Sequence, residues 1–534
     1  AESLQSDGRA SLVVSDAGAE TGAVQRLVWT SPPTPDAAVV PARELLRWAL
    51  ERVLSTGGGS ALLCLPDARA VGRVVEEAQR AGLTRWKHSH GGDFVVLDHD
   101  DGPTARYEGY LAALNGRVAL VIGTRPVALQ PVPRLASIGV WDEASDALQE
   151  QLAPYPHART VAAMRSVSEG AHLLLAGYTV SVDAAALVAH QFAVSVLAER
   201  EHVRKSAPRV EIVDDESRVR EGSAARHWMP SDVWKSLRQA ATEQPVSIQV
   251  PRTGYVNAVA CAQCSTWAAC TYCEGSLRIP APGEPPVCRD CGREHRDWHC
   301  PECRSARLKA TRQGVQAIAQ QLRLMAPELE VHVSAAATGV LTDHSVDKGI
   351  VVATPGALPA VAGGYARLAI VSADAAVQGG LGAELLALRW WLNAAALVRG
   401  RDSGGVVSVL GELLPTVRQA LVAWDPWSVA TDAYTERATL GLPPSRRAVS
   451  LEGDSRAIDA ALKVTVAGSP LSRALSSVGT VPAPITVSHT PTGVVLLLPR
   501  GLTQEAVDGL RAVVKERSRT GDSPLKLVVD APLA

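Results

Sequence analysis

Eight of the nine cysteines in this chain form four pairs with the spacing Cys-x-x-Cys, all within residues 261–303. A two-residue gap lets a tight turn direct both thiolates of a pair at one metal ion. Two such turns complete the tetrahedral shell of a structural zinc ion and leave no position for a catalytic water. The sequence therefore predicts two structural zinc sites. The pairs are Cys261/Cys264, Cys270/Cys273, Cys288/Cys291 and Cys300/Cys303.

Disulfide bonds are the alternative use of these cysteines, and the rest of the sequence argues against them. We find no basic segment followed by an apolar stretch of the kind that directs secretion. The ninth cysteine, Cys64, lies in the apolar run 61–65. Disulfides persist mainly in secreted proteins, so zinc ligation is the preferred interpretation.

The spacing between the pairs indicates how they share the two ions. Fourteen residues separate Cys273 from Cys288, which suits the loop of a zinc ribbon, whereas only five separate Cys264 from Cys270. We therefore expect a nested arrangement. His295 and His299 lie nearby and are alternative ligands, although packing or surface roles are preferred because eight thiols suffice. The expected ligands are Cys261, Cys264, Cys300 and Cys303 for zinc 1, and Cys270, Cys273, Cys288 and Cys291 for zinc 2.

Length and composition describe a globular protein of several domains. A chain of 534 residues exceeds the size of one hydrophobic core. No run of eighteen apolar residues is present, which disfavours a membrane-spanning helix. The net charge of −2 provides no overall basic field, so any binding to nucleic acid must come from local patches.

Outside the cysteines, short apolar runs alternate with amphipathic helical stretches, as in parallel α/β sheets covered by helices. The alternation occurs twice, and the cysteine segment interrupts the second series. A last block, from about residue 449, has the strand and helix order of a small α+β domain. The expected strands are 26–29, 61–65, 118–122, 137–141 and 173–176, then 210–213, 246–250, 330–333, 349–352 and 368–371.

Several segments carry a resemblance to a known family. Arg-Thr-Gly-Tyr at 252–255 precedes the cysteines, Gly-Thr-Arg-Pro occupies 123–126, and a strand that ends in Asp-Glu occupies 135–143. The stretch 436–444 reads Glu-Arg-Ala-Thr-Leu-Gly-Leu-Pro-Pro. With the cysteine array, these segments resemble the PriA family of bacterial replication-restart helicases, also called primosomal protein N′. The resemblance runs from about residue 25 to the end of the chain.

The resemblance implies two RecA-like helicase lobes, each a parallel sheet with flanking helices. It also implies a two-zinc insertion in lobe 2 and a small C-terminal α+β domain. The expected division is a linker or the tail of a missing upstream region at 1–24, lobe 1 at 25–203, lobe 2 at 204–251 and 313–435, the zinc insertion at 252–312 and the C-terminal domain at 436–534.

The phosphate-binding loop of the family is missing from its expected place. Such a helicase requires Gly-x-x-x-x-Gly-Lys-Ser/Thr between its first strand and first helix, but residues 30–36 read Thr-Ser-Pro-Pro-Thr-Pro-Asp. Three prolines remove N–H donors that should cradle phosphate oxygens. Thr34 is instead expected to cap a helix with Pro35 and Asp36 in its first turn, which puts a carboxylate where a phosphate belongs. The chain thus resembles a degenerate PriA that lacks the Walker A motif.

Other segments that handle ATP in the family are altered as well. Ala144 and Ser145 follow Asp142 and Glu143, where the family has an acid and a histidine. Without phosphates to bridge, we expect Asp142 and Glu143 to cap the following helix rather than to hold Mg²⁺. Residues 176–180 and 352–357 keep only the outline of two further family motifs.

The position of an arginine finger is also changed. Arg399 corresponds to the first arginine of the family's QVAGRAGR motif, but Asp402 replaces the second. A negative charge there cannot stabilise phosphoryl transfer. We therefore expect no catalytic residues, no ATP and a pseudo-helicase.

By resemblance, the chain is expected to bind stalled or abandoned replication forks and to help assemble the primosome and reload the replicative helicase. The implied partners are forked or single-stranded DNA, the replicative helicase and its loader, and the single-stranded-DNA-binding protein. An active ATP-dependent 3′–5′ DNA helicase with an atypical nucleotide site is one alternative. A protein scaffold that does not bind DNA is another.

Basic and aromatic residues beside the cysteines are candidates for contacts with phosphates and unpaired bases. A solvated surface is an equally good explanation, because acidic residues are interspersed among them. The candidates are Arg252, Tyr255, Arg304, Arg307 and Lys309.

No segment matches the DNA-binding and winged-helix modules that precede the motor in the family. The expectation is a C-terminal part of a longer protein, or a form without those modules. The expected location is the bacterial cytoplasm, in association with the nucleoid and not with a membrane.

Overall fold

The computed structural model describes most of the chain between residues 23 and 530. Arg252 and Tyr255 are outside the described residues, as is nearly all of the tail expected at 1–24. The described range excludes 35, 98–101, 214–228, 252–258, 265, 267, 274, 276, 280–283, 289–290, 311–313, 374–380, 467–468, 471–484 and 491–492.

Lobe 1 is a parallel sheet with the strand order β3-β4-β2-β5-β6-β1-β7. Its central strands β2, β5 and β6 are buried and mostly apolar because helices cover both faces of the sheet. In β2, Leu62 and Cys64 join the core on one face, whereas Ala61 and Leu63 join the core on the other. The strands are β1 (Arg26–Thr30), β2 (Ser60–Cys64), β3 (Phe94–Leu97), β4 (Leu120–Gly123), β5 (Leu135–Trp141), β6 (His172–Gly177) and β7 (Val194–Leu197). The helices are α1 (Val40–Ser55), α2 (Ala68–Arg80), α3 (Pro103–Leu114), η2 (Arg125–Leu129), η3 (Asp146–Leu148), α4 (Ala158–Ser168) and α5 (Val182–Ala189).

Lobe 2 is a second parallel sheet, with the order β14-β15-β9-β16-β17-β8. The two parallel α/β sheets confirm the predicted fold class of two RecA-like lobes. The strands are β8 (Arg209–Val213), β9 (Pro245–Gln249), β14 (Val331–Ser334), β15 (Gly349–Ala353), β16 (Arg367–Ile370) and β17 (Val406–Leu410). The helices are α6 (Arg200–Ser206), α8 (Ser231–Ala241), α9 (Val315–Met325), α11 (Ala383–Ala395), η5 (Arg401–Ser403), α12 (Pro415–Ala423) and α13 (Pro426–Leu440).

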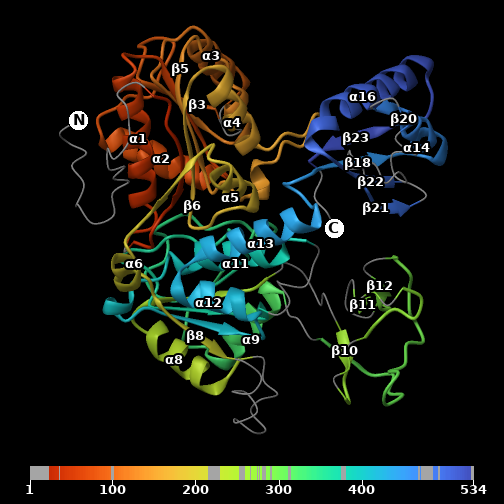
Figure 1. Cartoon of the computed structure of the whole chain (residues 1–534). Helices are drawn as coiled ribbons and strands as arrows, with labels where there is room; N and C mark the ends of the chain where they lie inside the picture. Colours follow the sequence, from red (N-terminus) through yellow and green to blue (C-terminus); the bar gives the residue numbers. More distant parts are fainter. Residues whose placement is uncertain are drawn as a thin grey trace.

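The two lobes pack directly on one another, with α13 lying along their boundary (Figure 1). Val429 of α13 belongs to the core of lobe 2, and the next residue, Ala430, belongs to a core of lobe 1. Tyr178 follows β6 in lobe 1 but packs in the core of lobe 2, with its ring 6.4 Å from that of Trp424. Shared cores of this kind bury apolar surface between the lobes and stabilise their contact.

The cysteine segment is inserted between β9 and α9 and projects from lobe 2 as a separate small module (Figure 1). It contains two short antiparallel ribbons, and its core includes four of the cysteines and the buried Trp298. The first ribbon pairs β10 (Val259–Cys261) with β13 (Leu308–Ala310), and the second pairs β11 (Leu277–Arg278) with β12 (Val287–Cys288).

The C-terminal domain is a four-stranded antiparallel sheet with the order β21-β22-β18-β23, as the α+β pattern predicts. Two helices, α14 and α16, pack on it. None of the helices in the described part of the chain is both long enough and apolar enough to cross a bilayer. The elements are β18 (Arg447–Glu452), α14 (Ser455–Leu462), β19 (Thr465–Val466), β20 (Ser469–Pro470), β21 (Ile485–Thr490), β22 (Gly493–Leu498), η6 (Arg500–Leu502), α16 (Thr503–Thr520) and β23 (Lys526–Val529).

The start of α1 differs from the expectation that Thr34 caps it. The helix begins at Val40, after a turn in which the Asp36 carbonyl accepts hydrogen bonds from the N–H groups of Val39 and Val40. Pro41 is tolerated in the first turn because N–H groups at that position have no acceptor within a helix, so proline costs no hydrogen bond there. The N-cap is Val39, so the predicted start at Thr34 was wrong by five residues.

Candidate metal centres and the cleft between the lobes

The eight paired cysteines form two clusters of four. Within each cluster, all four Sγ atoms lie within 4.8 Å of one another, and the grouping is the nested one. Individual Sγ–Sγ distances are 3.3 and 3.4 Å in the first cluster and 3.5 and 3.7 Å in the second. Tetrahedral coordination at about 2.3 Å separates neighbouring sulfurs by roughly 3.8 Å. Both donor sets therefore fit a zinc ion closely. The clusters are Cys261, Cys264, Cys300 and Cys303, and Cys270, Cys273, Cys288 and Cys291.

The turns between paired cysteines are held by N–H groups that point at sulfur. The N–H of Gln263 lies 3.4 Å from Cys261 Sγ, and that of Tyr272 lies 3.4 Å from Cys270 Sγ. Such donors stabilise thiolate rather than thiol. The Cys-x-x-Cys spacing produces this geometry locally, and the two ribbons then bring distant pairs together.

His295 and His299 differ in their relation to the clusters. His295 is buried, with Nε2 3.3 Å from Cys270 Sγ. This distance suits a hydrogen bond to a sulfur that is already a member of a four-cysteine group. His299 is exposed, and its Nδ1 lies 2.9 Å from the Asp297 carbonyl. Both observations fit the preferred packing and surface roles.

The candidate DNA contacts are only partly described. Arg304 and Arg307 are exposed on the module, and Lys309 lies in β13, where its backbone pairs with Ala260. Tyr272 is 69% exposed, and the guanidinium of Arg293 lies 3.7 Å from its ring centroid. No feature of the sequence distinguishes this stacked pair from the other aromatic residues nearby.

A cavity of about 320 Å³ lies between the lobes, at the carboxyl ends of strands in both sheets. Open parallel sheets bind ligands at this edge. Lobe 1 contributes the starts of α1 and α2 and the segment after β5, and lobe 2 contributes α11 and the loop after β15. Charged groups from both lobes line it, namely Asp67, Arg69, Arg73, Asp142, Asp146 and Arg389.

Asp142 is the first residue of the Asp-Glu pair that follows β5 (the acidic box), and side chains of lobe 2 bind it. Arg389 donates from Nε to Oδ1 at 2.8 Å and from Nη2 to Oδ2, and Asn393 donates to Oδ2 at 3.2 Å. Arg389 and Asn393 are four residues apart on α11 and so share one helix face. The Asp142 side chain is only 8% exposed. Both carboxylate oxygens are therefore occupied, and the expectation that Asp142 caps the next helix was wrong because a long-range ion pair takes its place.

Glu143 is likewise committed inside lobe 1. Arg159 donates to its Oε2 at 2.9 Å, and the N–H and hydroxyl of Ser181 donate to its two oxygens at 2.6 and 2.9 Å. The side chain is 1% exposed. Glu143 thus fixes the start of α5 rather than capping the helix that follows it in sequence.

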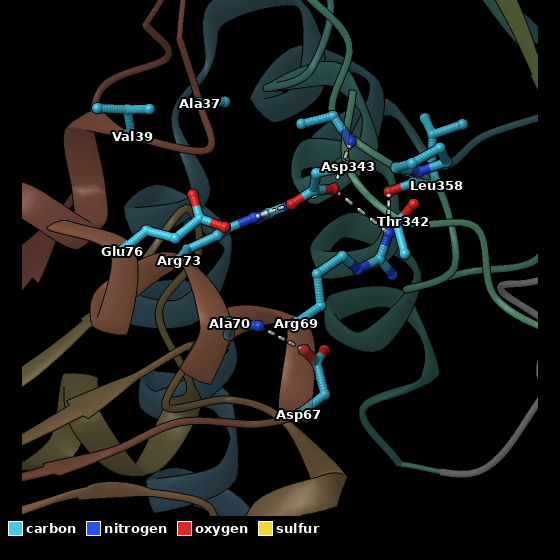
Figure 2. Close-up of polar contacts among 12 residues, drawn as sticks. Ala37, Val39, Asp67, Arg69, Ala70, Arg73, Glu76, Thr342, Asp343 and Leu358 are labelled. Carbon is cyan, nitrogen blue, oxygen red and sulfur yellow. Dashed lines mark hydrogen bonds and ion pairs between the residues drawn. The ribbon is translucent and has the colours of Figure 1, made fainter. Parts of the chain in front are cut away.

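Two arginines of α2 extend from lobe 1 to lobe 2 (Figure 2). Arg73 donates from Nε and Nη2 to the two oxygens of Asp343, at 2.7 and 3.0 Å. Arg69 donates to the backbone carbonyls of Gly356 and Leu358, at 2.5 and 2.8 Å. The segment 352–357 therefore binds an arginine of the chain itself.

Arg399 and Asp402 lie outside the residues that line this cavity. The Arg399 guanidinium donates to the Gly364 carbonyl at 3.2 Å, and Asp402 is exposed in η5. Sequence reasoning missed Arg69, Arg73, Asp343 and Arg389. The only available signal was the four-residue spacing of Arg69 and Arg73, which is common on surface helices.

Comparison with curated proteins finds replication restart proteins. The probable replication restart protein PriA of Mycobacterium tuberculosis is 37% identical over 411 residues, or 76% of this chain and 62% of the relative. That of Mycobacterium leprae is 37% identical over 414 residues, with the same two shares. The replication restart protein PriA of Bacillus subtilis is 24% identical over 292 residues, or 54% of this chain and 35% of the relative. The chain is similar to these PriA proteins over 76% of its length.

The chain spans about 62% of the length of the mycobacterial proteins that it matches. No protein-family model matches it. Among solved structures, RecG bound to a three-way DNA junction aligns with a TM-score of 0.41 and 11% identity, covering 77% of this chain and 44% of RecG. Saccharomyces cerevisiae Dbp5 bound to RNA and ADP BeF3 aligns with a TM-score of 0.38 and 10% identity, covering 77% of this chain and 83% of Dbp5.

Proposed function

We propose that this chain acts in replication restart without hydrolysing ATP. It binds stalled or abandoned forks and helps to assemble the primosome and to reload the replicative helicase. The similarity of the chain to PriA replication restart proteins supports a role in replication restart. The proposed partners are forked or single-stranded DNA, the replicative helicase and its loader, and the single-stranded-DNA-binding protein.

The ion pair between Asp142 and Arg389 carries the proposal that ATP is not hydrolysed. A motor of this class holds Mg²⁺ through the first acid of its acidic box, and the metal bridges the nucleotide phosphates. Here a guanidinium occupies both oxygens of that acid. A metal ion would have to displace a buried arginine, which would then lose its counter-ion.

The junction between β1 and α1 supports the same proposal. Phosphate binding requires successive free N–H groups at a helix start, and here prolines occupy positions 32, 33 and 35. The helix begins only at Val40, whose N–H is already bonded to the Asp36 carbonyl, and the next residue, Pro41, has no N–H. The junction provides neither a lysine nor a ring of N–H donors for a phosphate.

The zinc ions that we propose would act on structure alone. Each cluster supplies four thiolates, so a bound ion has no open position for water or substrate. The module has a small core, and two metal cross-links would stabilise its ribbons. The exposed side chains of Arg304 and Arg307 would then lie at fixed positions, from which they can contact phosphates.

ATP binding and turnover by the zinc-loaded chain, with and without forked DNA, test the proposal. We expect fork binding, no nucleotide binding and no DNA-stimulated hydrolysis. Arg389→Ala frees Asp142 and should still give no turnover, because the junction after β1 is unchanged. DNA-stimulated hydrolysis by the wild-type chain would overturn the proposal in favour of an active helicase. Absence of fork binding would favour a protein scaffold.

A further inference from the structure

We propose that Arg69 and Arg73 form a latch that holds the two lobes closed in the absence of any nucleotide. In two-lobe proteins, a ligand in the cleft usually supplies the contacts that close it, and the lobes separate when it leaves. In this chain the closing contacts come from side chains of α2. The inference goes beyond the proposed function, because it concerns lobe movement and requires neither DNA nor a protein partner.

The latch has two parts on one helix face. Arg73 and Asp343 make a two-point ion pair, and Asp343 Oδ1 also accepts the N–H of Ala360 at 2.8 Å. Both carboxylate oxygens are therefore satisfied. Arg69, one turn earlier, donates to the carbonyls of Gly356 and Leu358 and lies 3.9 Å from Asp343. Figure 2 shows both side chains reaching from α2 to this loop of lobe 2.

The surroundings make the latch costly to open. The side chains of Arg69, Arg73 and Asp343 are 17%, 23% and 15% exposed, so little water screens their charges. Burial alone would raise the pKa of Asp343, but its bonds with Arg73 lower that pKa below the ordinary value, which keeps the carboxylate charged. Separation of the lobes would break these bonds and would expose the apolar residues of the shared core to water.

Both ends of the latch are themselves fixed. The Asp67 side chain caps α2 by accepting the N–H of Ala70 at 2.8 Å, so Arg69 and Arg73 project from a defined helix start. On lobe 2, the hydroxyl of the buried Tyr365 donates to the Pro359 carbonyl at 3.0 Å and holds the loop that receives Arg69. The contact between the lobes is therefore preorganised on both sides.

Other contacts act with the latch. Asp142 and Arg389 line the same cavity and also join the lobes. Tyr178 packs against Trp424, and the Tyr434 hydroxyl of α13 lies 3.0 Å from Nε2 of His190, which follows α5. Contacts at separated points resist both hinge and sliding motion, so the lobes should move as one body.

A distance measurement between the lobes tests the latch. Leu54 at the end of α1 and Leu324 on α9 are 71% and 78% exposed. Each is replaced by p-acetylphenylalanine, to which a spin label is attached. Non-cysteine labelling spares the metal clusters. Pulsed electron–electron double resonance on the full zinc-loaded chain should give one narrow distribution of the distance between the two labels. Neither Mg-ATP nor forked DNA should change it.

Variants on each side of the latch provide independent tests. Arg69→Ala with Arg73→Ala, and Asp343→Ala by itself, should each add a longer-distance population. They alter different lobes, so a shared effect cannot come from misfolding of one lobe. Arg80→Ala is the matched control, because Arg80 lies on the same helix but pairs only with Glu76 and Glu77 of lobe 1 in the described contacts. The exchange Arg73→Asp with Asp343→Arg should restore the narrow distance in part.

Two results would overturn the latch. One is a broad or nucleotide-dependent distance in the wild-type chain, and the other is a narrow, unchanged distance in both latch variants. Neither result bears on fork binding, which is measured separately on the same samples. A failure of the proposed function therefore leaves this test intact.

Discussion

Asp142 and Arg389 stand 247 residues apart in sequence and form a two-point ion pair across the cleft, with Arg389 Nε 2.8 Å from Asp142 Oδ1. Asp142 has φ of +53°, a left-handed conformation that L residues rarely adopt. The backbone turn directs the carboxylate out of the end of β5 and toward α11. An acid that would hold a metal ion in a motor thereby becomes part of the contact between the lobes.

Loss of one partner of this pair should destabilise the contact strongly. Arg389→Ala leaves Asp142 charged, almost fully buried and without its ion-pair partner, which we expect to cost about 3–5 kcal/mol. Thermal unfolding followed by tryptophan fluorescence should show a lower first transition. The exposed pair Arg519–Glu516 gives the control, since Arg519→Ala should leave the unfolding midpoint almost unchanged. Equal effects of the two substitutions would contradict this role of Arg389.

Zinc content and thiol reactivity should reveal two classes of cysteine. We expect two zinc ions per chain and, after chelation, rapid reaction of eight thiols with a disulfide reagent. Cys64 should remain unreactive until the chain unfolds, because burial raises the pKa of its thiol to about 12 and its side chain is inaccessible. Cys264→Ser and Cys273→Ser should each lower the zinc content by one ion. Nine equally reactive thiols in the native chain would contradict both assignments.

The nested cysteine groups and the strands of the sheets could be predicted from the sequence for the same physical reason. Neighbouring residues determine a Cys-x-x-Cys turn. The short gap from Cys264 to Cys270 disfavours an arrangement in which these two adjacent pairs share one ion, because too few residues connect them. A buried parallel strand such as β2 is recorded as an unbroken apolar run. Such features depend on local order, so a pattern in the sequence is sufficient to predict them.

The contacts across the cleft could not be predicted from the sequence in this way. Nothing near Asp142 in the sequence indicates Arg389, and nothing near Arg73 indicates Asp343, 270 residues later. These pairs depend on how the lobes pack, which follows from the shared cores around Val429 and Tyr178. One segment of the sequence is enough to expect that the phosphate loop is missing, whereas the ion pairs across the cleft can be seen only when both lobes are in place.

His157 should make the stability of lobe 1 depend on pH. Burial, with a smaller effect of the nearby Arg159, lowers the pKa of His157 to about 3, and the ring accepts the Arg159 N–H at Nδ1. Its pKa in the unfolded chain is about 6.5, so the unfolded state binds the proton first. Stability is therefore complete above about pH 6.5 and falls as the pH drops toward 3, by about 1–2 kcal/mol at pH 5.

His157→Asn isolates that contribution. Asparagine retains a side-chain acceptor for the start of α4, where His157 is the N-cap, but does not titrate. The difference in unfolding midpoint between wild type and variant should change between pH 7 and pH 5, with the wild type losing more. A difference that stays constant over this range would show that His157 does not carry the effect.

The salt dependence of fork binding should identify arginines of the zinc module that contact phosphates. Each phosphate contact releases condensed counterions, so its loss reduces the slope of log K against log salt by about 0.9 on duplex DNA. Arg304→Ala and Arg307→Ala, at exposed positions, should each weaken binding and reduce the slope by about that amount. Arg296→Ala is the matched control, because Arg296 lies on the same module but pairs with Glu294 at 2.8 Å. Weaker binding with an unchanged slope would indicate a structural effect of the substitution. If none of the three substitutions changes fork binding, the DNA-binding surface should be sought on the lobes instead.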